Sequence, residues 1–142
     1  PRPSIKGSLD FSFSGLKTAV LRRAEEKGIY PPPADGEPDA QQVAEVSEAF
    51  QDAMVDCMVT RTVQAAKRHQ VRGIVLGGGV AANSRLRDRM SEESPVQVVV
   101  PAPELCTDNA AMIGAAAFFS LRAAGASVRS WDLDVVPNLR LG

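Results

Sequence analysis

The sequence has little of several residue types that define whole classes of protein. Its 142 residues include one histidine and two cysteines. The cysteines, Cys57 and Cys106, lie far apart and form no CxxC pair, so neither a zinc knuckle nor a thioredoxin-like site is indicated. Two reduced thiols of a cytoplasmic protein are expected instead. No apolar run approaches the ~20 residues of a membrane helix, and the first residues lack the apolar segment of a secretory signal.

An excess of charge of either sign is also missing. The net charge is −1, and charged residues make up 23% of the chain. Nucleic-acid-binding domains usually carry a basic footprint, so any RNA contacts are expected to be local or to lie outside this sequence. The hydrophobic fraction of 44% is ordinary for a globular domain. Because the initiator methionine is missing, we expect a chain that was processed, truncated or cut from a longer protein.

The first forty residues predict a strand, a helix and a loop. Leu9–Ser14 alternates apolar and polar residues, which is typical of a strand. A helix is expected over Leu16–Lys27, and Gly28 ends it. Residues 29–39 are rich in proline and are expected to form a loop.

A long helix is predicted over Ala40–His69. Asp39 is expected to be its N-cap, with Gln42 reaching back as the partner of a capping box. His69 at its end suits a cation near a helix C-terminus better than a metal ligand. The apolar residues that recur at three- and four-residue steps predict the buried face of this helix: Val43, Val46, Phe50, Met54, Cys57 and Met58.

The second half predicts strands that alternate with helices. The apolar segments Gly73–Leu76 and Val96–Val100 are expected to be strands, the first of them buried on both faces of a sheet. Helices are expected over Ala82–Met90 and Thr107–Ala124, and Gly125 ends the second. This order indicates an α/β fold with a parallel sheet. Three strand candidates are few for a complete doubly wound sheet, so a neighbouring piece is expected to be absent.

Gly77, Gly78 and Gly79 follow the first of these strands directly. Glycine lets the backbone approach a ligand closely, and the following helix would point its free N–H groups at the same spot, which favours phosphate. The segment matches neither GxGxxG nor the P-loop. It is either a tight turn or a phosphate-binding site, and Asn83 after it either caps the helix or hydrogen-bonds a ligand.

Two further motifs carry polar side chains. In Cys106–Met112, Thr107 or Asp108 is expected to cap the following helix. Alternatively, Asp108 faces the same crevice as the glycine turn, because ligands bind outside the carboxyl ends of parallel strands. In Asp10–Thr18, serine and lysine side chains either touch a phosphate or belong to a hairpin edge and an N-cap.

Three segments in this order resemble the signatures of one family, the tRNA threonylcarbamoyladenosine transferases, long labelled O-sialoglycoprotein endopeptidases or glycoproteases. The segments are Asp10–Thr18, Gly78–Asn83 and Cys106–Ile113, and the resemblance extends from Leu9 to about Gly125. It implies an α/β fold, namely a ribonuclease-H-like lobe of the actin/Hsp70/sugar-kinase fold. Residues 1–142 would be the C-terminal part of the second, nucleotide-binding lobe, with the N-terminal lobe absent.

The resemblance also implies a reaction. The family transfers a threonylcarbamoyl group from threonylcarbamoyl-adenylate, which derives from ATP, to the N6 amine of a tRNA adenosine next to the anticodon. It implies one transition-metal ion, iron or zinc, in the full-length protein, together with accessory proteins of a tRNA-modification complex and a cytoplasmic location. By motif match, Gly78 and Gly79 lie in the phosphate-side turn, Asn83 binds the nucleotide, and Asp108 is a metal ligand. No residue is assigned as catalytic.

The sequence departs from the family in one large respect. The His-x-x-x-His pair that supplies the family's other metal ligands is missing, so the isolated chain is expected to be inactive and to bind no transition metal tightly. An exposed apolar patch or a homodimer contact is expected where absent parts would pack, at the Met54 and Phe50 stripe and the Ala-rich helix after Asp108. The alternatives are a metal-dependent glycoprotein endopeptidase and a non-catalytic lobe that binds nucleotide or docks partners.

Overall fold

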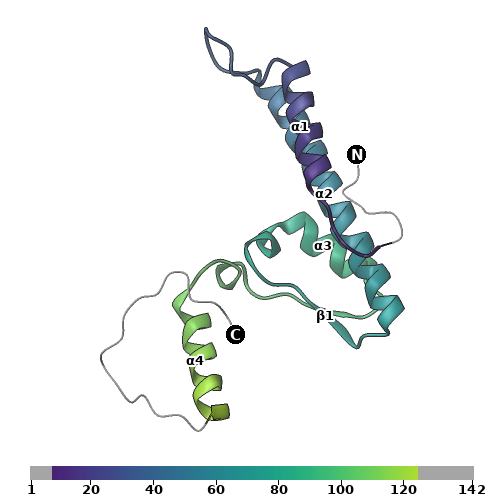
Figure 1. Cartoon of the computed structure of the whole chain (residues 1–142), viewed down its shortest axis with the longest axis vertical. Helices are drawn as coiled ribbons and strands as arrows, with labels where there is room; N and C mark the ends of the chain where they lie inside the picture. Colours follow the sequence, from purple (N-terminus) through teal and green to yellow (C-terminus); the bar gives the residue numbers. More distant parts are fainter. Residues whose placement is uncertain (1–7, 125–142) are drawn as a thin grey trace. The chain divides into compact units, whose positions relative to one another are not determined.

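The computed structural model describes residues 8–124. The chain divides into two compact units, with the boundary between Thr107 and Asp108, and each is described by itself. The expected helix stop at Gly125 lies outside the described residues. Within the described range, no helix has the length and apolar character needed to cross a membrane. The elements of the first unit are α1 (Ser14–Glu26), α2 (Ala40–His69), β1 (Gly73–Val75), η1 (Gly79–Ala82), α3 (Ser84–Glu93), β2 (Gln97–Val99) and η2 (Pro103–Leu105) (Figure 1).

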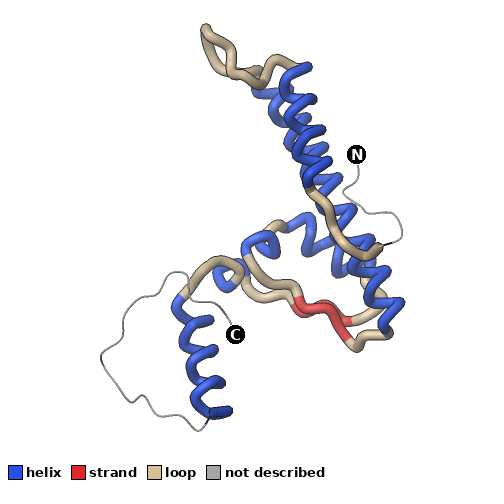
Figure 2. The backbone as a smooth tube through the Cα atoms, in the orientation of Figure 1, coloured by secondary structure: helices blue, strands red, loops and turns tan. Residues whose placement is uncertain are grey.

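Helices α1 and α2 lie side by side and are joined by the expected loop over residues 29–39 (Figures 1 and 2). Gly28 follows α1 with φ +66°, a conformation that glycine adopts without strain. Leu16 is buried, and Lys27 Nζ lies 2.7 Å from Glu45 Oε2. The helical hairpin therefore combines one buried leucine with an ion pair between its two helices.

The strand expected over Leu9–Ser14 is wrong. Residues 8–13 form no β-strand beyond a single bridge at Phe11, and α1 begins at Ser14, two residues before the expected start. Phe11 and Phe13 do lie on one side, with ring centroids 6.0 Å apart, as a two-residue repeat predicts. However, a strand also needs a neighbour to complete its backbone hydrogen bonds, and the described sheet contains only β1 and β2.

The bounds of α2 are those predicted, and Asp39 is its N-cap. Asp39 Oδ1 accepts a hydrogen bond from the Gln42 backbone N–H at 3.0 Å. The expected return bond is absent, since Gln42 Oε1 is buried without a partner among the described residues. At the other end, Gln70 adopts the left-handed conformation that often follows a helix, with φ 49°. The capping box is therefore half formed.

The buried face predicted for α2 is only partly correct. Cys57 is buried, but Val43 and Phe50 are 37% and 40% exposed. The fully buried side chains are Val55 and Val59, each one position beyond the expected Met54 and Met58. The reason is that α2 has two sets of partners. Its first half packs against α1, whereas its second half packs against α3 and the strands, which lie in another direction.

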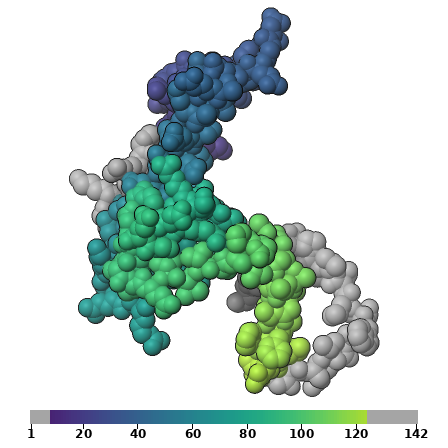
Figure 3. Space-filling model, turned by 180° about the vertical axis from the view of Figure 1, so that it is seen from behind, coloured from purple at the N-terminus to yellow at the C-terminus, as the bar shows by residue number. Residues whose placement is uncertain are grey.

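The strands β1 and β2 pair in parallel, as predicted, with Ile74 opposite Val98. Helix α3 connects them, so the segment is a βαβ unit. Ile74 and Val98 face a core formed with α2 and α3. In the space-filling view, the strands and α3 (teal to green) form one continuous packed body (Figure 3). The residues of this core are Val55, Val59, Ala66, Ile74, Leu86 and Met90.

The expectation that the first strand is buried on both faces is wrong. Val75 is 76% exposed, and its register partner Val99 is 51% exposed. The described helices of this unit cover only the face that Ile74 and Val98 share. The opposite face of the sheet is thus exposed at Val75 and Val99, and Phe50 of α2 and Ile113 of the last helix are exposed in the two regions where an apolar patch was expected. The homodimer contact stays a prediction.

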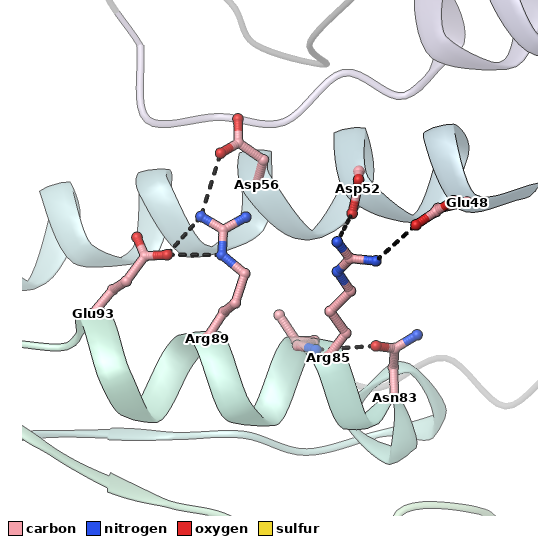
Figure 4. A network of polar contacts seen from close by, with 8 residues as sticks. Glu48, Asp52, Asp56, Asn83, Arg85, Arg89 and Glu93 are labelled. Atoms are coloured by element: carbon pink, nitrogen blue, oxygen red, sulfur yellow. Dashed lines mark hydrogen bonds and ion pairs between the residues drawn. The ribbon is translucent and has the colours of Figure 1, made fainter. Parts of the chain in front are cut away.

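Ion pairs join α2 to α3 on the solvent side of this core (Figure 4). Arg85 Nη2 lies 2.6 Å from Asp52 Oδ1, and Arg89 Nη2 lies 3.4 Å from Asp56 Oδ1. Arg89 Nε also donates to Glu93 at 2.7 Å, and these contacts raise the pKa of Arg89. Because the groups are partly exposed, each pair contributes about 0–1 kcal/mol. The pairs therefore orient α3 more than they stabilise it.

The second unit contains α4 (Ala110–Ala124), which begins later than predicted. Asn109 Oδ1 accepts a hydrogen bond from the Met112 N–H at 3.0 Å. This is the geometry of an N-cap, so the expectation that Thr107 or Asp108 caps this helix is wrong. Large apolar side chains of α4, such as Ile113 and Phe119, are exposed.

The one-sided core predicts unequal effects of substitutions on the two sheet faces. Leu86 is 1% exposed, so Leu86→Ala should lower the free energy of unfolding by about 2–5 kcal/mol, because it leaves a cavity. Val99→Thr on the open face should change it by less than about 0.5 kcal/mol. Urea unfolding of both variants measures the difference, and similar losses would show that the open face is also packed.

Candidate functional site

Two turns lie at the same end of the parallel sheet. The first follows β1 and contains Gly77–Gly79, and the second follows β2 and contains η2. Because the strands are parallel, their carboxyl ends share one edge, where ligands of open α/β sheets bind. The short helices η1 and η2 contact each other there. The two turns therefore form one surface within the first unit.

The glycine turn presents unpaired backbone donors. Gly78 has φ +80°, which L-residues with a side chain rarely adopt. The N–H groups of Gly77, Gly78, Gly79 and Val80 have no hydrogen-bond partner in the described part of the chain. Successive free N–H groups in a turn make a concave surface that binds anions. The turn is therefore equipped to hold a phosphate.

Crowding by described residues does not explain the run of glycines. A Cβ added at Gly77 or Gly79 would meet no heavy atom within 4 Å. Only Gly78 is required by its backbone conformation. The other two glycines therefore leave open space beside the unpaired N–H groups.

The α-helix after the turn begins later than predicted, so the unpaired N–H groups are not those of its first turn. The segment Gly79–Ala82 forms η1, and α3 begins at Ser84 rather than Ala82. The N-terminus of α3 does not follow the glycines directly, because η1 and Asn83 intervene. The free donors consequently belong to the turn itself.

Asn83 is the N-cap of α3 (Figure 4). Its Oδ1 accepts a hydrogen bond from the Leu86 N–H at 3.0 Å, so the capping alternative is confirmed. Its Nδ2 has no partner among the described residues. Asn83 can therefore cap the helix with one atom of its amide and donate to a ligand with the other.

Arg87 is a residue that sequence reasoning missed. Its Nε donates to the carbonyl of Ala81 in η1, and its Nη2 donates to the carbonyl of Pro101 at 2.8 Å. The same Nη2 lies 3.0 Å from Cys106 Sγ. The available signal was its position one turn after Asn83, because helical side chains lean toward the N-terminus of their helix.

The two cysteines differ in their surroundings. Cys106 is buried beside Arg87 and the Ala102 carbonyl. Cys57 is buried in α2, and this burial raises the pKa of its thiol. Neither cysteine forms a disulfide with a described residue.

Asp108 opens the second unit. Its side chain is exposed and makes no hydrogen bond or ion pair within residues 8–124. No group of three or more His, Cys, Asp or Glu side chains in that range is arranged to hold a metal ion. His69 is at the exposed end of α2. Asp108 thus offers one available carboxylate, and its expected place beside Gly78 stays a prediction.

The motif Asp10–Thr18 reaches the glycine turn through an apolar pocket of about 500 Å³. Its polar side chains mostly bond locally, as Thr18 Oγ1 does with the Ser14 carbonyl at 3.1 Å. Its apolar side chains and Lys17 line the pocket. The lining residues are Phe13, Leu16, Lys17, Val20, Phe50, Met54, Met58 and Val80. Val80 belongs to η1, so two of the three motifs meet here, which the sequence did not predict.

Comparison with known proteins supports the resemblance. The TsaD family model, described as tRNA N6-adenosine threonylcarbamoyltransferase, matches residues 1–115. A relative of that name from Symbiobacterium thermophilum is 46% identical over 146 aligned residues, covering 100% of this chain and 40% of the relative. One from Dehalococcoides mccartyi is 42% identical, covering 98% of this chain and 39% of the relative.

A third relative of the same name, from Geobacillus thermodenitrificans, is 49% identical over 118 residues, covering 78% of this chain and 32% of the relative. The chain thus spans about two fifths of the length of the first curated relatives it matches. The family model, which matches most of the chain, includes both turns of the candidate site. The chain therefore belongs to the tRNA N6-adenosine threonylcarbamoyltransferase family.

Proposed function

We propose that this chain is part of an enzyme that transfers a threonylcarbamoyl group to the N6 amine of a tRNA adenosine next to the anticodon. The names of the relatives state this chemistry for them and support it over the endopeptidase alternative. The observation that carries the proposal is the glycine turn with its unpaired N–H groups, followed along the chain by the unpaired Nδ2 of Asn83. This arrangement suits the phosphate of an adenylate.

The proposed donor is threonylcarbamoyl-adenylate, a mixed anhydride. The N6 nitrogen forms a bond to the carbamoyl carbon, the bond from that carbon to the phosphate oxygen breaks, and AMP leaves with the electron pair. The amine loses one proton, for which no residue of this chain is assigned as the base. Gly77–Val80 would hold the phosphate and stabilise the negative charge on the departing AMP through donors already in place.

Asn83 would contact the nucleotide through Nδ2. Its Oδ1 already accepts from the Leu86 N–H, so the side chain would serve the ligand mainly as a donor. The resemblance assigns this position to nucleotide binding. The unpaired Nδ2 supports that assignment and would be the atom that donates to the nucleotide.

Asp108 would supply one ligand to a metal ion, proposed to be iron or zinc. The exposed carboxylate without a competing partner in the described chain fits this role, and its other ligands would come from outside the described residues. When bound, the ion would supply positive charge at the site.

We further propose that residues 1–142 form the C-terminal part of the second lobe of an actin/Hsp70/sugar-kinase fold, and that accessory proteins act with the complete enzyme.

A chimera tests the proposed function. The equivalent segment of the Symbiobacterium thermophilum relative is replaced by this chain, with which it aligns throughout. The chimera should incorporate labelled threonine into tRNA, whereas the isolated chain should not, because it supplies only one candidate metal ligand. A chimera that melts like the parent relative but leaves tRNA unlabelled would refute the proposal.

Asn83→Ala and Asn83→Ser separate capping from nucleotide binding. Both remove Nδ2 and should weaken AMP binding by a similar factor of roughly tenfold, which corresponds to about one hydrogen bond. Only Asn83→Ala should also lower the free energy of unfolding, by about 0.5–2 kcal/mol, because serine still caps a helix. Calorimetric AMP binding and thermal melting of the chimera measure both effects. Wild-type binding by Asn83→Ser would leave Asn83 as a cap only.

Asp108→Ala in the chimera should reduce the transfer rate by about a hundredfold or more. Substituting a residue that only supports a metal ligand already lowers metal affinity or activity by roughly 10- to 100-fold, and loss of a ligand should have a larger effect. The melting temperature should not change, because Asn109 rather than Asp108 caps α4. Glu104→Ala is the matched control, an exposed carboxylate in η2. Transfer rates and melting curves decide the matter. Equal activity of the two variants would remove Asp108 from the site.

A further inference from the structure

We propose that Arg87 is a positioning residue that holds the two turns of the candidate site together. The inference rests on the proposed function, because that proposal assigns the glycine turn to the adenylate and because the second turn leads to Asp108. The contacts of Arg87 itself all lie within the first unit. None of the motifs in the sequence pointed to this residue.

Arg87 joins three segments that are separated along the chain. It projects from α3, which connects the strands, and it bonds to η1 after β1 and to Pro101 after β2. Its third contact, Cys106, is buried and follows η2 directly. The guanidinium therefore bridges the ends of both strands, where η1 and η2 contact each other.

The contacts of Arg87 require an arginine rather than any cation. A guanidinium presents several donors in a rigid planar fork, whereas a lysine ammonium is a single centre on a flexible stem. Nε and Nη2 of Arg87 reach carbonyls on two different turns. A lysine at this position would keep the charge but could not hold both turns in the same geometry.

The charge of Arg87 is not balanced by a carboxylate within residues 8–124. Its acceptors are two carbonyls and a thiol, although the side chain is partly buried. Arg85 and Arg89 on the same helix face carboxylates instead. A partly buried cation without an ionic partner is costly, and its field favours an anion close by. A phosphate on the glycine turn would supply that anion.

Hydrogen exchange in the 142-residue chain tests the positioning role. The reporters are the amides of Ala81 and Asn83 in and after η1, and of Leu105 and Cys106 in and after η2, which are all hydrogen-bonded locally. Both Arg87→Lys and Arg87→Met should make them exchange about tenfold faster, since a bond to a charged group is worth roughly that factor in a local equilibrium. Arg89→Lys is the matched control and should leave them unchanged.

Two further measurements make the result specific. Maleimide should label Cys106 faster in both Arg87 variants, whereas Cys57 stays protected in α2. Core amides of α2 and α3 should keep their protection. Equal loss of protection in the core would overturn the proposal, because Arg87 would then be a general stabiliser. Full rescue by Arg87→Lys would also overturn it, because charge alone would suffice.

AMP binding by the chimera separates this inference from the proposed function. AMP should bind about tenfold more weakly to both Arg87 variants and normally to Arg89→Lys. If AMP does not bind the unmodified chimera, the nucleotide assignment fails while the exchange data still decide the role of Arg87. If AMP binding weakens but exchange and labelling do not change, Arg87 contacts the ligand directly and the positioning role is wrong.

Discussion

The parallel pairing of β1 with β2 is the constraint on which the rest of the structure depends. Parallel strands need a crossover between them, and α3 is that crossover. The crossover buries Leu86 and Met90 on the face of the sheet that Ile74 and Val98 share. The same geometry brings the carboxyl ends of both strands to one edge. The same βαβ connection thus forms the core and positions the candidate site.

The periodicity of α3 lets its side chains reach both the interface with α2 and the candidate site. Residues four apart lie on one side of a helix, whereas a two-residue step turns the side chain by about 200°. Arg85 and Arg89 accordingly face the carboxylates of α2 (Figure 4), and Arg87 faces the turns. One short helix therefore directs alternate arginines to the packing interface and to the site.

The sequence predicted the elements that local patterns determine. The bounds of α2, the cap at Asp39, the loop after Gly28 and the order of strand, helix and strand could all be read from it. It failed where tertiary contacts decide. The fully buried residues of α2 lie one position beyond those predicted, because the second half of the helix packs against α3 and the strands. The segment with Phe11 and Phe13 did not form the expected strand.

The candidate site was predictable to a similar extent. Glycines, Asn83 and Asp108 carry recognisable chemistry in their motifs. The role of Arg87 depends on carbonyls from segments 6 and 14 residues away, and backbone carbonyls have no sequence signature. The pocket between Phe13 and Val80 was missed for the same reason. Which segments meet is decided by the fold and leaves no local pattern.

The three glycines bear on what the turn is for. If they served only the fold, each would meet a backbone constraint or a crowded neighbour. Gly78 meets the first, but Gly77 and Gly79 have open space where a Cβ would stand. The space lies beside unpaired N–H groups and near a guanidinium whose charge no described carboxylate balances. Gly77–Val80 are exposed, so water bonds their N–H groups in the free chain, whereas an uncompensated, partly buried charge and missing side chains cost stability. A bound anion would replace the water on these donors, offset the charge and fill the open space.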